Sequence, residues 1–283
     1  MKDVRYHAFH ILNDFNRSND RLKSIRDLYF KKCKLSQNDL SRTLVLTNEV
    51  VRWQGRLDFW ISSFLDKPIK KLHPSIHIIL RLGYYEAVMD NLIPPHAAVH
   101  SWVELAKSEL GKRFGGLVNA LMRKTGNIHP TEKFGDQLLN EWYSYPNWLF
   151  QKWNEQFGKG KATQLCEYFN QPSPNDIRLN GDKGSRSEIV NQLEKDGIKL
   201  VGSPESDRFY RVETGMGKVL KNDQFKMGLI QSQDRASGAV VELLDPQPGE
   251  TILDVCAAPG TKSGYIVERM KSNGQIYSSD ISH

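Results

Sequence analysis

The sequence predicts a multidomain fold: an all-α bundle, then a small α+β unit, then the beginning of an α/β domain. Three observations support this division. Apolar residues recur at helical spacing through residues 1–130, without the alternation typical of strands. Residues 131–226 contain helical segments followed by alternating strand-like and helix-like stretches. Residues 227–283 end in a strand, a turn of small residues, a helix and a second strand.

Helix boundaries in residues 1–130 are marked by capping residues, glycine and proline. Ser36 and Asp39 resemble a capping box at the start of one helix, and Pro74 stands at the first position of another. Gly83 lies inside that second helix, where glycine costs helix propensity, so we expect it to permit close packing of a neighbouring helix. Gly115-Gly116 is expected to break the chain before a last helix over residues 117–124.

The positive charge is concentrated in the first part of the chain. The net charge is +6, but residues 1–130 carry 21 Lys and Arg against 12 Asp and Glu, or +9, and the remainder carries 18 against 21, or −3. A basic region of this kind suggests an anionic partner, with nucleic acid the leading candidate. A solvated basic surface without a partner explains the charge alone equally well.

Residues 131–226 are expected to hold linker helices and a small α+β unit of the ferredoxin-like or RRM-like kind. Residues 126–140 are polar and contain proline, as linkers do. The next segment, residues 141–172, is rich in aromatic side chains at helical spacing, which predicts one buried helical face; stacking on RNA bases is the alternative. These aromatic residues are Trp142, Trp148, Phe150, Trp153, Phe157, Tyr168 and Phe169.

The stretch from Thr251 to Asp280 carries the strongest functional signal. Residues 252–256 form a nearly continuous apolar run, typical of a strand buried on both faces. Ala257-Ala-Pro-Gly260 uses small residues and a fixed-φ proline, so a ligand can approach the backbone at the carboxyl end of that strand. Asp280 follows the next strand, where an acid is expected to accept hydrogen bonds from ribose hydroxyls. The turn does not read G-x-G-x-x-G, so a dinucleotide is not indicated.

Four segments of residues 1–130 carry a family resemblance: Ser41-Arg-Thr-Leu…Val50-Val-Arg-Trp, Leu80-Arg-Leu-Gly-Tyr-Tyr-Glu, Ile93-Pro-Pro-His-Ala-Ala-Val and Gly116-Leu-Val-Asn-Ala-Leu-Met-Arg. They resemble the NusB-like helical domain. That domain stands alone in a transcription antitermination factor and is fused to the front of bacterial 16S rRNA (cytosine-C5) methyltransferases of the Sun (RsmB) family. The Ile93-Pro-Pro-His-Ala-Ala-Val segment resembles the fused form. His96 in this segment is interpreted as a residue at the start of a helix, without a catalytic role.

Asp254-Val-Cys-Ala-Ala-Pro-Gly-Thr-Lys262 resembles the first S-adenosyl-L-methionine motif of the same family. The resemblance implies a NusB-like bundle over residues 1–130, linker helices and a ferredoxin-like RNA-binding unit over 131–226, and the N-terminal part of a Rossmann-like methyltransferase domain over 227–283. Thr261 stands where the commoner family pattern has a second glycine. The cofactor contacts implied are Cys256, Ala257, Ala258, Pro259, Gly260, Thr261, Lys262 and Asp280.

The mechanism implied by the resemblance uses cysteines. Enzymes of this family attack cytosine C6 with a thiolate, which activates C5 toward the methyl group, and the target base must leave its stack. Their cysteines lie in Pro-Cys and Thr-Cys motifs further along the catalytic domain, so the expected nucleophile lies beyond His283 and we assign no catalytic residue within the chain. We expect a truncated chain, inactive alone, whose own Cys33, Cys166 and Cys256 are buried inert thiols.

The expected partner is small-subunit ribosomal RNA, without a metal ion or a membrane. A cytoplasmic location is expected because the three cysteines form no disulfide framework and no apolar run is long enough to cross a bilayer. Two alternatives stay open. One is a non-catalytic RNA-binding module of the antitermination type, and the other is a methyltransferase for a protein or a small molecule.

Overall fold

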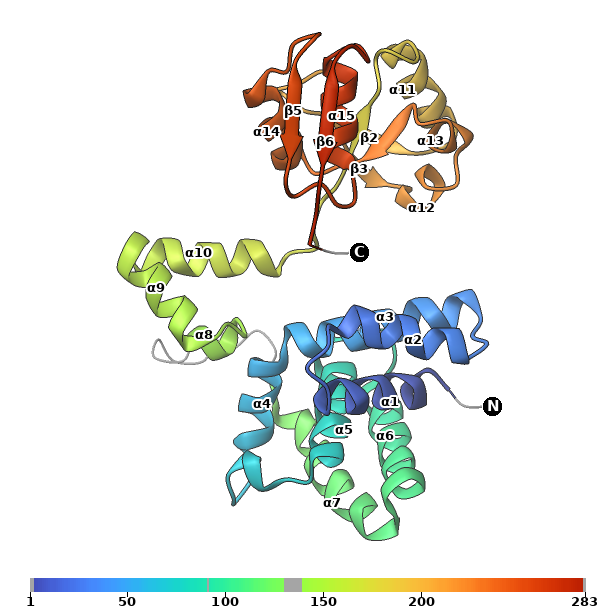
Figure 1. The fold of residues 1–283 in the computed structure, drawn as a ribbon. Helices are drawn as coiled ribbons and strands as arrows, with labels where there is room; N and C mark the ends of the chain where they lie inside the picture. The colour runs from blue at the N-terminus through green and yellow to red at the C-terminus, as the bar shows by residue number, and fades with distance from the viewer. Residues whose placement is uncertain (1–2, 91, 130–138, 282–283) are drawn as a thin grey trace. The chain divides into compact units, whose positions relative to one another are not determined.

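The computed structural model describes residues 3–90, 92–129 and 139–281. The chain forms two compact units, residues 1–171 and residues 172–283 (Figure 1). The described part of the first unit is helical, and both sheets belong to the second unit. The predicted order of a helical part, a small α+β part and the beginning of an α/β part is confirmed, while the domain boundaries at residues 130 and 226 stay predictions.

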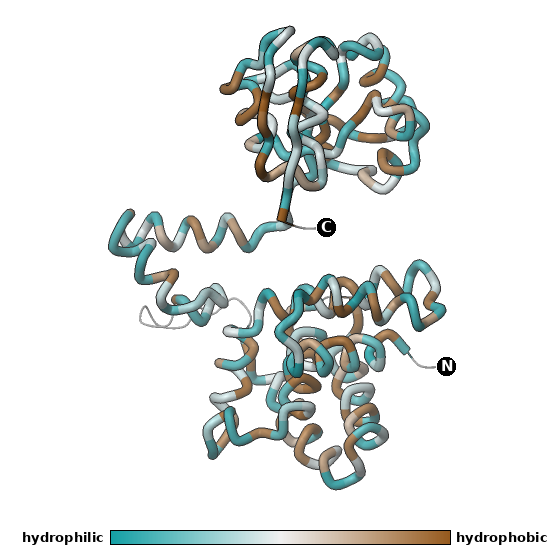
Figure 2. The backbone as a smooth tube through the Cα atoms, in the orientation of Figure 1, coloured by the Kyte–Doolittle hydropathy of each residue, from teal (hydrophilic) through white to brown (hydrophobic). Residues whose placement is uncertain are grey.

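The first unit is built around helix α5. Its elements are α1 (Val4–Asn16), α2 (Leu22–Lys32), α3 (Gln37–Arg52), α4 (Gln54–Ser62), η1 (Ile69–Lys71), α5 (Pro74–Tyr84), η2 (Tyr85–Met89), α6 (Pro95–Leu110), α7 (Lys112–Met122), η3 (Arg123–Asn127), α8 (Leu139–Trp142), α9 (Asn147–Phe157) and α10 (Lys159–Asn170). α5 packs against α1, α4, α6 and α7. In Figure 2, hydrophobic and hydrophilic residues alternate along these helices, as expected of helices that bury one face. Within the described ranges, no helix is long and apolar enough to cross a membrane.

The helix starts and the packing glycine follow the sequence prediction. Ser36 Oγ accepts a hydrogen bond from the Asp39 backbone N–H at 3.1 Å, and Pro74 occupies the first turn of α5. A Cβ atom at Gly83 would lie 2.5 Å from Met122 Sδ, so only glycine lets α5 approach this side chain of α7 so closely.

The expected break at Gly115-Gly116 is wrong. α7 runs from Lys112 to Met122 through both glycines, and the chain turns instead at Gly111, whose φ is 101°. Val118 and Leu121 are buried on the inner face of α7. Burial of this apolar face outweighs the low helix propensity of the two glycines.

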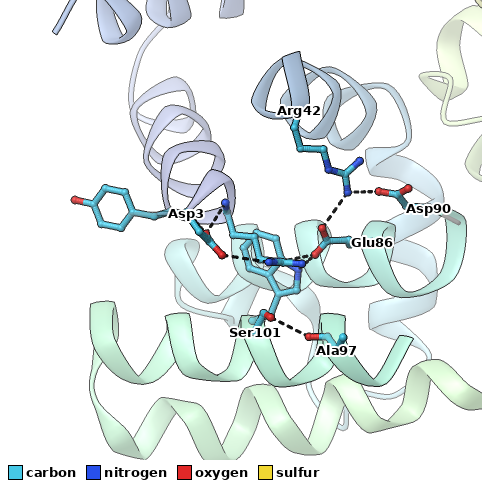
Figure 3. A network of polar contacts seen from close by, with 9 residues as sticks. Asp3, Arg42, Glu86, Asp90, Ala97 and Ser101 are labelled. Carbon is cyan, nitrogen blue, oxygen red and sulfur yellow. Dashed lines mark hydrogen bonds and ion pairs between the residues drawn. The ribbon is translucent and has the colours of Figure 1, made fainter. Parts of the chain in front are cut away.

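A buried carboxylate joins four elements of the first unit (Figure 3). Glu86 of η2 is 1% exposed and accepts hydrogen bonds from Arg5 Nε at 2.7 Å, Arg42 Nη2 at 2.9 Å and Trp102 Nε1 at 2.8 Å. Arg42 also pairs with Asp90. These donors come from α1, α3 and α6. Because a buried charge is costly without partners, the cluster fixes η2 between three helices.

A second carboxylate links α4 to α5. Asp58 Oδ1 lies 2.6 Å from His77 Nε2 and 2.7 Å from Arg81 Nε. Burial favours the neutral acid, but the hydrogen bonds from Arg81 and His77 outweigh it and hold the pKa of Asp58 below its usual value.

The aromatic segment after the bundle does not form one buried face, contrary to the prediction. α9 has no buried residue. Trp148, Tyr168 and Phe169 are 66%, 67% and 54% exposed. The local core instead consists of Leu139, Trp142, Tyr143 and Cys166. Most of the linker expected over residues 126–140 lies outside the described residues.

This small aromatic core is attached to the bundle through one arginine. The Arg56 guanidinium of α4 lies 3.8 Å from the centroid of the Trp142 ring, and its Nε donates to the Trp142 carbonyl at 2.6 Å. The backbone N–H of Arg56 donates to Ser144 Oγ at 2.9 Å. α8 is therefore held against α4 by polar contacts and ring stacking together.

The second unit begins with a four-stranded antiparallel sheet. Its elements are β1 (Asn175–Leu179), α11 (Arg186–Lys195), β2 (Lys199–Gly202), β3 (Phe209–Thr214), α12 (Met216–Val219), α13 (Asp223–Lys226), β4 (Ile230–Ser232), α14 (Arg235–Leu244), β5 (Thr251–Asp254), α15 (Thr261–Arg269) and β6 (Gln275–Ser278). The strand order β2-β3-β1-β4, with α11 after β1 and short helices before β4, is that of a ferredoxin-like unit. β4 falls in the range expected to open the third domain, yet it pairs with β1.

This sheet is covered on both faces within the second unit. Ile177 and Leu179 of β1 pack on the α11 side of the sheet. Phe209 of β3 packs on the other side, in a core with Val241 of α14 and Tyr265 of α15. The helices that flank the predicted cofactor loop therefore rest directly on the ferredoxin-like sheet.

Candidate functional site

The predicted cofactor residues lie at the carboxyl end of a parallel strand pair. β5 pairs with β6 in parallel, with Asp254 opposite Ser278, and α15 connects the two strands. Such a strand–helix–strand unit places the loop after the first strand beside the segment after the second. The loop of residues 255–260 and Asp280 therefore meet at one edge of this sheet.

Two backbone donors of the loop contact the segment after β6. The Ala257 N–H donates to the Ser279 carbonyl at 3.1 Å, and the Ala258 N–H donates to Asp280 Oδ2 at 2.9 Å. The peptide bond between Ala258 and Pro259 is cis. The structure thus brings the Asp280 carboxylate against the backbone of the small-residue loop.

Asp254 shapes the loop, although from the sequence it was expected only to start the motif and not to contact the cofactor. Its Oδ1 accepts the Cys256 N–H at 3.2 Å, and its Oδ2 accepts the Ser263 hydroxyl at 2.7 Å. One carboxylate therefore ties the end of β5 to the first turn of α15. The available sequence signal was an acid as the last residue of an apolar strand, where Asp commonly bonds the backbone two residues on.

Gly260 ends the loop and begins α15. Its φ of 98° lies in the left-handed region, which glycine adopts without a Cβ clash. A Cβ atom would meet no atom within 4 Å at Gly260 or at Gly264, so open space lies beside the loop and the first turn. Thr261 and Lys262 are half-buried in that first turn. Their unpaired backbone N–H groups favour an anionic ligand group, because helix N-termini carry partial positive charge.

The far end of α15 is anchored by buried ion pairs. The Glu268 side chain, 2% exposed, pairs with Arg178 of β1 and with Arg208 Nη1 at 2.5 Å. Arg178 Nε also donates to Gln233 Oε1 at 2.8 Å, and its guanidinium lies 4.3 Å from the centroid of the Tyr265 ring. α15 is thus fixed at its start by Asp254 and near its end by the ferredoxin-like sheet.

Two ionisable groups of this anchor, Arg178 and Tyr265, have pKa values far from neutral pH. Burial lowers the pKa of Arg178 to about 10, which still leaves it protonated. Burial also raises the pKa of Tyr265 to about 12, helped by Glu242, which accepts the Tyr265 hydroxyl at 2.8 Å. Arg178 therefore stays charged and Tyr265 stays neutral in the physiological range.

The prediction that the strand before the loop is buried on both faces is wrong for this structure. Ile252 of β5 and Ile276 of β6 pack on the core of α14 and α15. Leu253 and Tyr277, which point to the opposite face, are 67% and 59% exposed. The physical reason is that α14 and α15 cover one face of the pair, and none of the described elements covers the other.

The three thiols have different surroundings, so the prediction of three buried thiols is correct only for one. Cys166 is buried, and burial raises its pKa to about 11. Cys33 is half-buried and Cys256, in the loop, is exposed. Among the described residues, no three His, Cys, Asp or Glu side chains are grouped so that they could hold a metal ion.

Three family descriptions match the chain in order. Residues 2–127 match the NusB family, residues 145–216 match the RsmF/B-like methyltransferase ferredoxin-like domain, and residues 241–283 match the 16S rRNA methyltransferase RsmB/F family. The last match contains the loop and Asp280.

Curated relatives align along most of the chain. A probable ribosomal RNA small subunit methyltransferase B of Synechocystis is 35% identical over 287 residues, covering 99% of this chain and 64% of the relative. A probable ribosomal RNA small subunit methyltransferase B of Bacillus subtilis is 31% identical over 270 residues, covering 93% of this chain and 58% of the relative. The chain therefore spans about three fifths of the length of these relatives.

A solved structure supports the fold. The crystal structure of PH0851 superposes with a TM-score of 0.68 at 23% identity, covering 97% of this chain and 62% of that one. At this identity the likeness concerns the fold alone. The chain thus carries, in order, a NusB region, an RsmF/B-like ferredoxin-like region and part of an RsmB/F methyltransferase region, and it aligns along nearly its whole length with relatives named ribosomal RNA small subunit methyltransferase B.

Proposed function

We propose that the protein serves in the S-adenosyl-L-methionine-dependent methylation of cytosine C5 in small-subunit ribosomal RNA, in the cytoplasm. The observation that carries this proposal is the hydrogen bond between the Asp280 carboxylate and the loop N–H of Ala258. This contact joins an acid to a small-residue loop at the end of a parallel strand, an arrangement that supports binding of a ribose and its attached chain. The names of the relatives support methyl transfer to small-subunit rRNA.

The residues present fit such a cofactor. Asp280 is proposed to accept hydrogen bonds from the ribose hydroxyls. The small side chains from Ala257 to Gly260 leave room for the ligand against the backbone, and no atom would contact a Cβ at Gly260. Thr261 and Lys262, in the first turn of α15, are proposed to face the carboxylate of the methionine part. Cys256 lines the same loop.

When bound, the cofactor supplies an electrophilic methyl group. The role proposed for this chain's own residues is to bind and orient it, because Asp254 and Glu268 hold α15 at both ends. None of the three thiols is proposed as the nucleophile. Cys166 is buried with a raised pKa, and Cys256 lies in the loop assigned to the cofactor. Because no nucleophile is assigned among these thiols, we expect the 283-residue polypeptide to transfer no methyl group.

Cofactor binding by the chain tests this proposal directly. We expect S-adenosylhomocysteine to bind in isothermal titration calorimetry, and Asp280→Asn to weaken binding about tenfold or more, because hydrogen bonds to a charged acceptor contribute about 1.5–3 kcal/mol. Asp223→Asn, at an exposed acid of α13, is the matched control. Equal binding of S-adenosylhomocysteine by both variants would show that Asp280 does not contribute to the cofactor site. Labelled methyl incorporation into unmodified small-subunit rRNA by the polypeptide alone would contradict the expected inactivity.

A second candidate, RNA binding without catalysis, is favoured by one observation, the +9 charge of residues 1–130. It predicts salt-sensitive RNA binding by the chain with no cofactor binding. Calorimetric binding of S-adenosylhomocysteine separates the two candidates.

A further inference from the structure

A groove of about 530 Å³ runs between α6 and α7 in the first unit, whereas the cofactor loop belongs to the second unit. α6 contributes His96, Val99, His100 and Val103 to its wall. These positions recur at three- and four-residue spacing, so they form one stripe of the helix. The opposite wall comes from α7 and the residue after it: Gly116, Asn119 and Arg123.

The groove has an apolar floor and polar edges. Val99 is half-buried and Val103 is 7% exposed, so the floor is made by the inner side of α6. His100 stands exposed on one edge, and Asn119 and Arg123 stand exposed on the other. A flat ligand with an anionic end matches this arrangement, because the floor contacts an apolar face and Arg123 can bind an anion.

The two neighbouring glycines of α7 have different surroundings. A Cβ atom at Gly115 would lie 2.4 Å from Lys107 Cγ, so this glycine makes room for the lysine stem. A Cβ atom at Gly116 would meet no atom within 4 Å. Glycine inside a helix costs up to about 1 kcal/mol relative to alanine. Packing explains that cost at Gly115 and does not explain it at Gly116, which opens onto the groove.

The charges around the groove favour an anion. Lys107 pairs with Glu104 at 2.7 Å, so the two side chains together add no net charge to the groove. Arg123 takes part in no ion pair with another described residue. Lys112 and Arg113 in the first turn of α7, and Lys124 next to Arg123 in η3, add positive charge to this part of the chain. The groove thus lies in the basic part of the chain and keeps a cation at its edge.

We propose that this groove binds a nucleotide of single-stranded RNA, with the base on the Val99 and Val103 floor beside His100 and the phosphate at Arg123. The inference rests on the proposed function, because it takes the substrate to be RNA. It adds a docking position for that substrate on the helical unit. A stacked base with a phosphate contact is the usual way in which proteins hold unpaired RNA.

The test fills the groove without disturbing the fold. Gly116→Gln adds a side chain where no atom lies within 4 Å, leaves the net charge unchanged and raises helix propensity. Gly160→Gln is the matched control, since Gly160 is also a helical glycine with no atom within 4 Å of a Cβ, in α10. Arg123→Gln removes the cation, and Arg17→Gln removes an exposed arginine of the same unit outside the groove.

Binding is measured on the full chain by fluorescence anisotropy with a labelled 12-nucleotide oligouridine and with a small-subunit rRNA fragment, at several salt concentrations. Gly116→Gln and Arg123→Gln are each expected to weaken binding about tenfold, against less than twofold for the two controls. The salt slope of log K is expected to fall by about 0.7 in Arg123→Gln only, as for one lost phosphate contact of a single strand. Circular dichroism verifies that all four variants are folded.

Several results would overturn the proposal. One is equal RNA binding by the groove variants and their controls, and another is absence of RNA binding by the unaltered chain at 50 mM salt. The third is a change in the self-association of the groove variants in sedimentation, which would assign the groove to a second copy of the chain. S-adenosylhomocysteine binding, measured on the same samples, should be unchanged in every variant. If the unaltered chain does not bind S-adenosylhomocysteine, the proposed function is contradicted. The RNA affinities of the variants test the groove separately.

Discussion

Replacing Glu268 by glutamine should loosen the second unit while leaving the first unit intact. Glu268 is buried between two arginines, of which Arg178 has a side chain only 4% exposed. Removing one partner of a buried ion pair costs about 3–5 kcal/mol, because the other charge stays in a poorly solvated place. Glutamine keeps one acceptor for Arg178, so we expect a loss at the low end, about 3 kcal/mol.

The neighbouring Arg269 provides a matched control on the same helix. Arg269 pairs with Asp245 at 2.5 Å, but the two side chains are 30% and 61% exposed. Exposed pairs contribute about 0–1 kcal/mol, since water screens them. Arg269→Gln should therefore cost at most about 1 kcal/mol.

The distribution of tryptophan separates the two units in the assay. All six tryptophans lie between residues 53 and 153, so their fluorescence during urea unfolding reports the first unit. Hydrogen exchange with mass spectrometry reports the second. In Glu268→Gln, protected amides of β3 and α15 should exchange about a hundredfold faster, since each 1.4 kcal/mol is a factor of ten. Equal exchange in Glu268→Gln and Arg269→Gln, or a shifted tryptophan transition, would refute the reasoning.

Three further substitutions test other contacts. Gly238→Ala puts a Cβ 2.0 Å from Phe209 Cζ, so overpacking of about 1–3 kcal/mol exceeds the gain of up to about 1 kcal/mol in helix propensity, and β3 amides should exchange faster. Asp58→Asn should lower the urea midpoint of tryptophan fluorescence at pH 7. Because the folded pKa of Asp58 is lowered, its stabilising effect is complete above the unfolded pKa near 4 and is lost progressively as the pH falls from there through the folded pKa, so the difference between the two midpoints should shrink in acid; a difference that stays constant down to pH 3 would contradict this. Asp254→Asn weakens the contacts that hold the loop, so exchange at Cys256 should accelerate while β1 stays protected; uniform acceleration would indicate general unfolding instead.

The parts of the fold that were predictable from sequence have local causes. The cap at Ser36 depends on a residue three positions away, and the loop before Gly260 depends on a contiguous run of small residues. The strand–helix–strand unit follows from period and spacing alone. Family resemblance then identified what each of the three parts is, which composition and periodicity alone do not reveal.

The errors concern positions where distant packing decides. Gly115-Gly116 has the local chemistry of a break, but the buried face of α7 keeps both glycines helical. The exposed Trp148 and Tyr168 have helical spacing, which shows which residues share a face but not whether anything covers it. Pairing of β4 with β1 joins segments about 50 residues apart through three residues, too few to carry a readable pattern.

The alternation along β1 couples the ferredoxin-like sheet to the cofactor loop. Ile177 and Leu179 face one core, so the residue between them, Arg178, must face the opposite side, where α15 carries Glu268. That helix begins at the loop that closes on Asp280. The sheet is therefore joined to the helix that begins at the loop by the ion pairs of Glu268 and by the packing of Phe209 on Tyr265. If the sheet were an independent module, breaking the Arg178–Glu268 pair would leave exchange at the loop unchanged, and this measurement decides between the two arrangements.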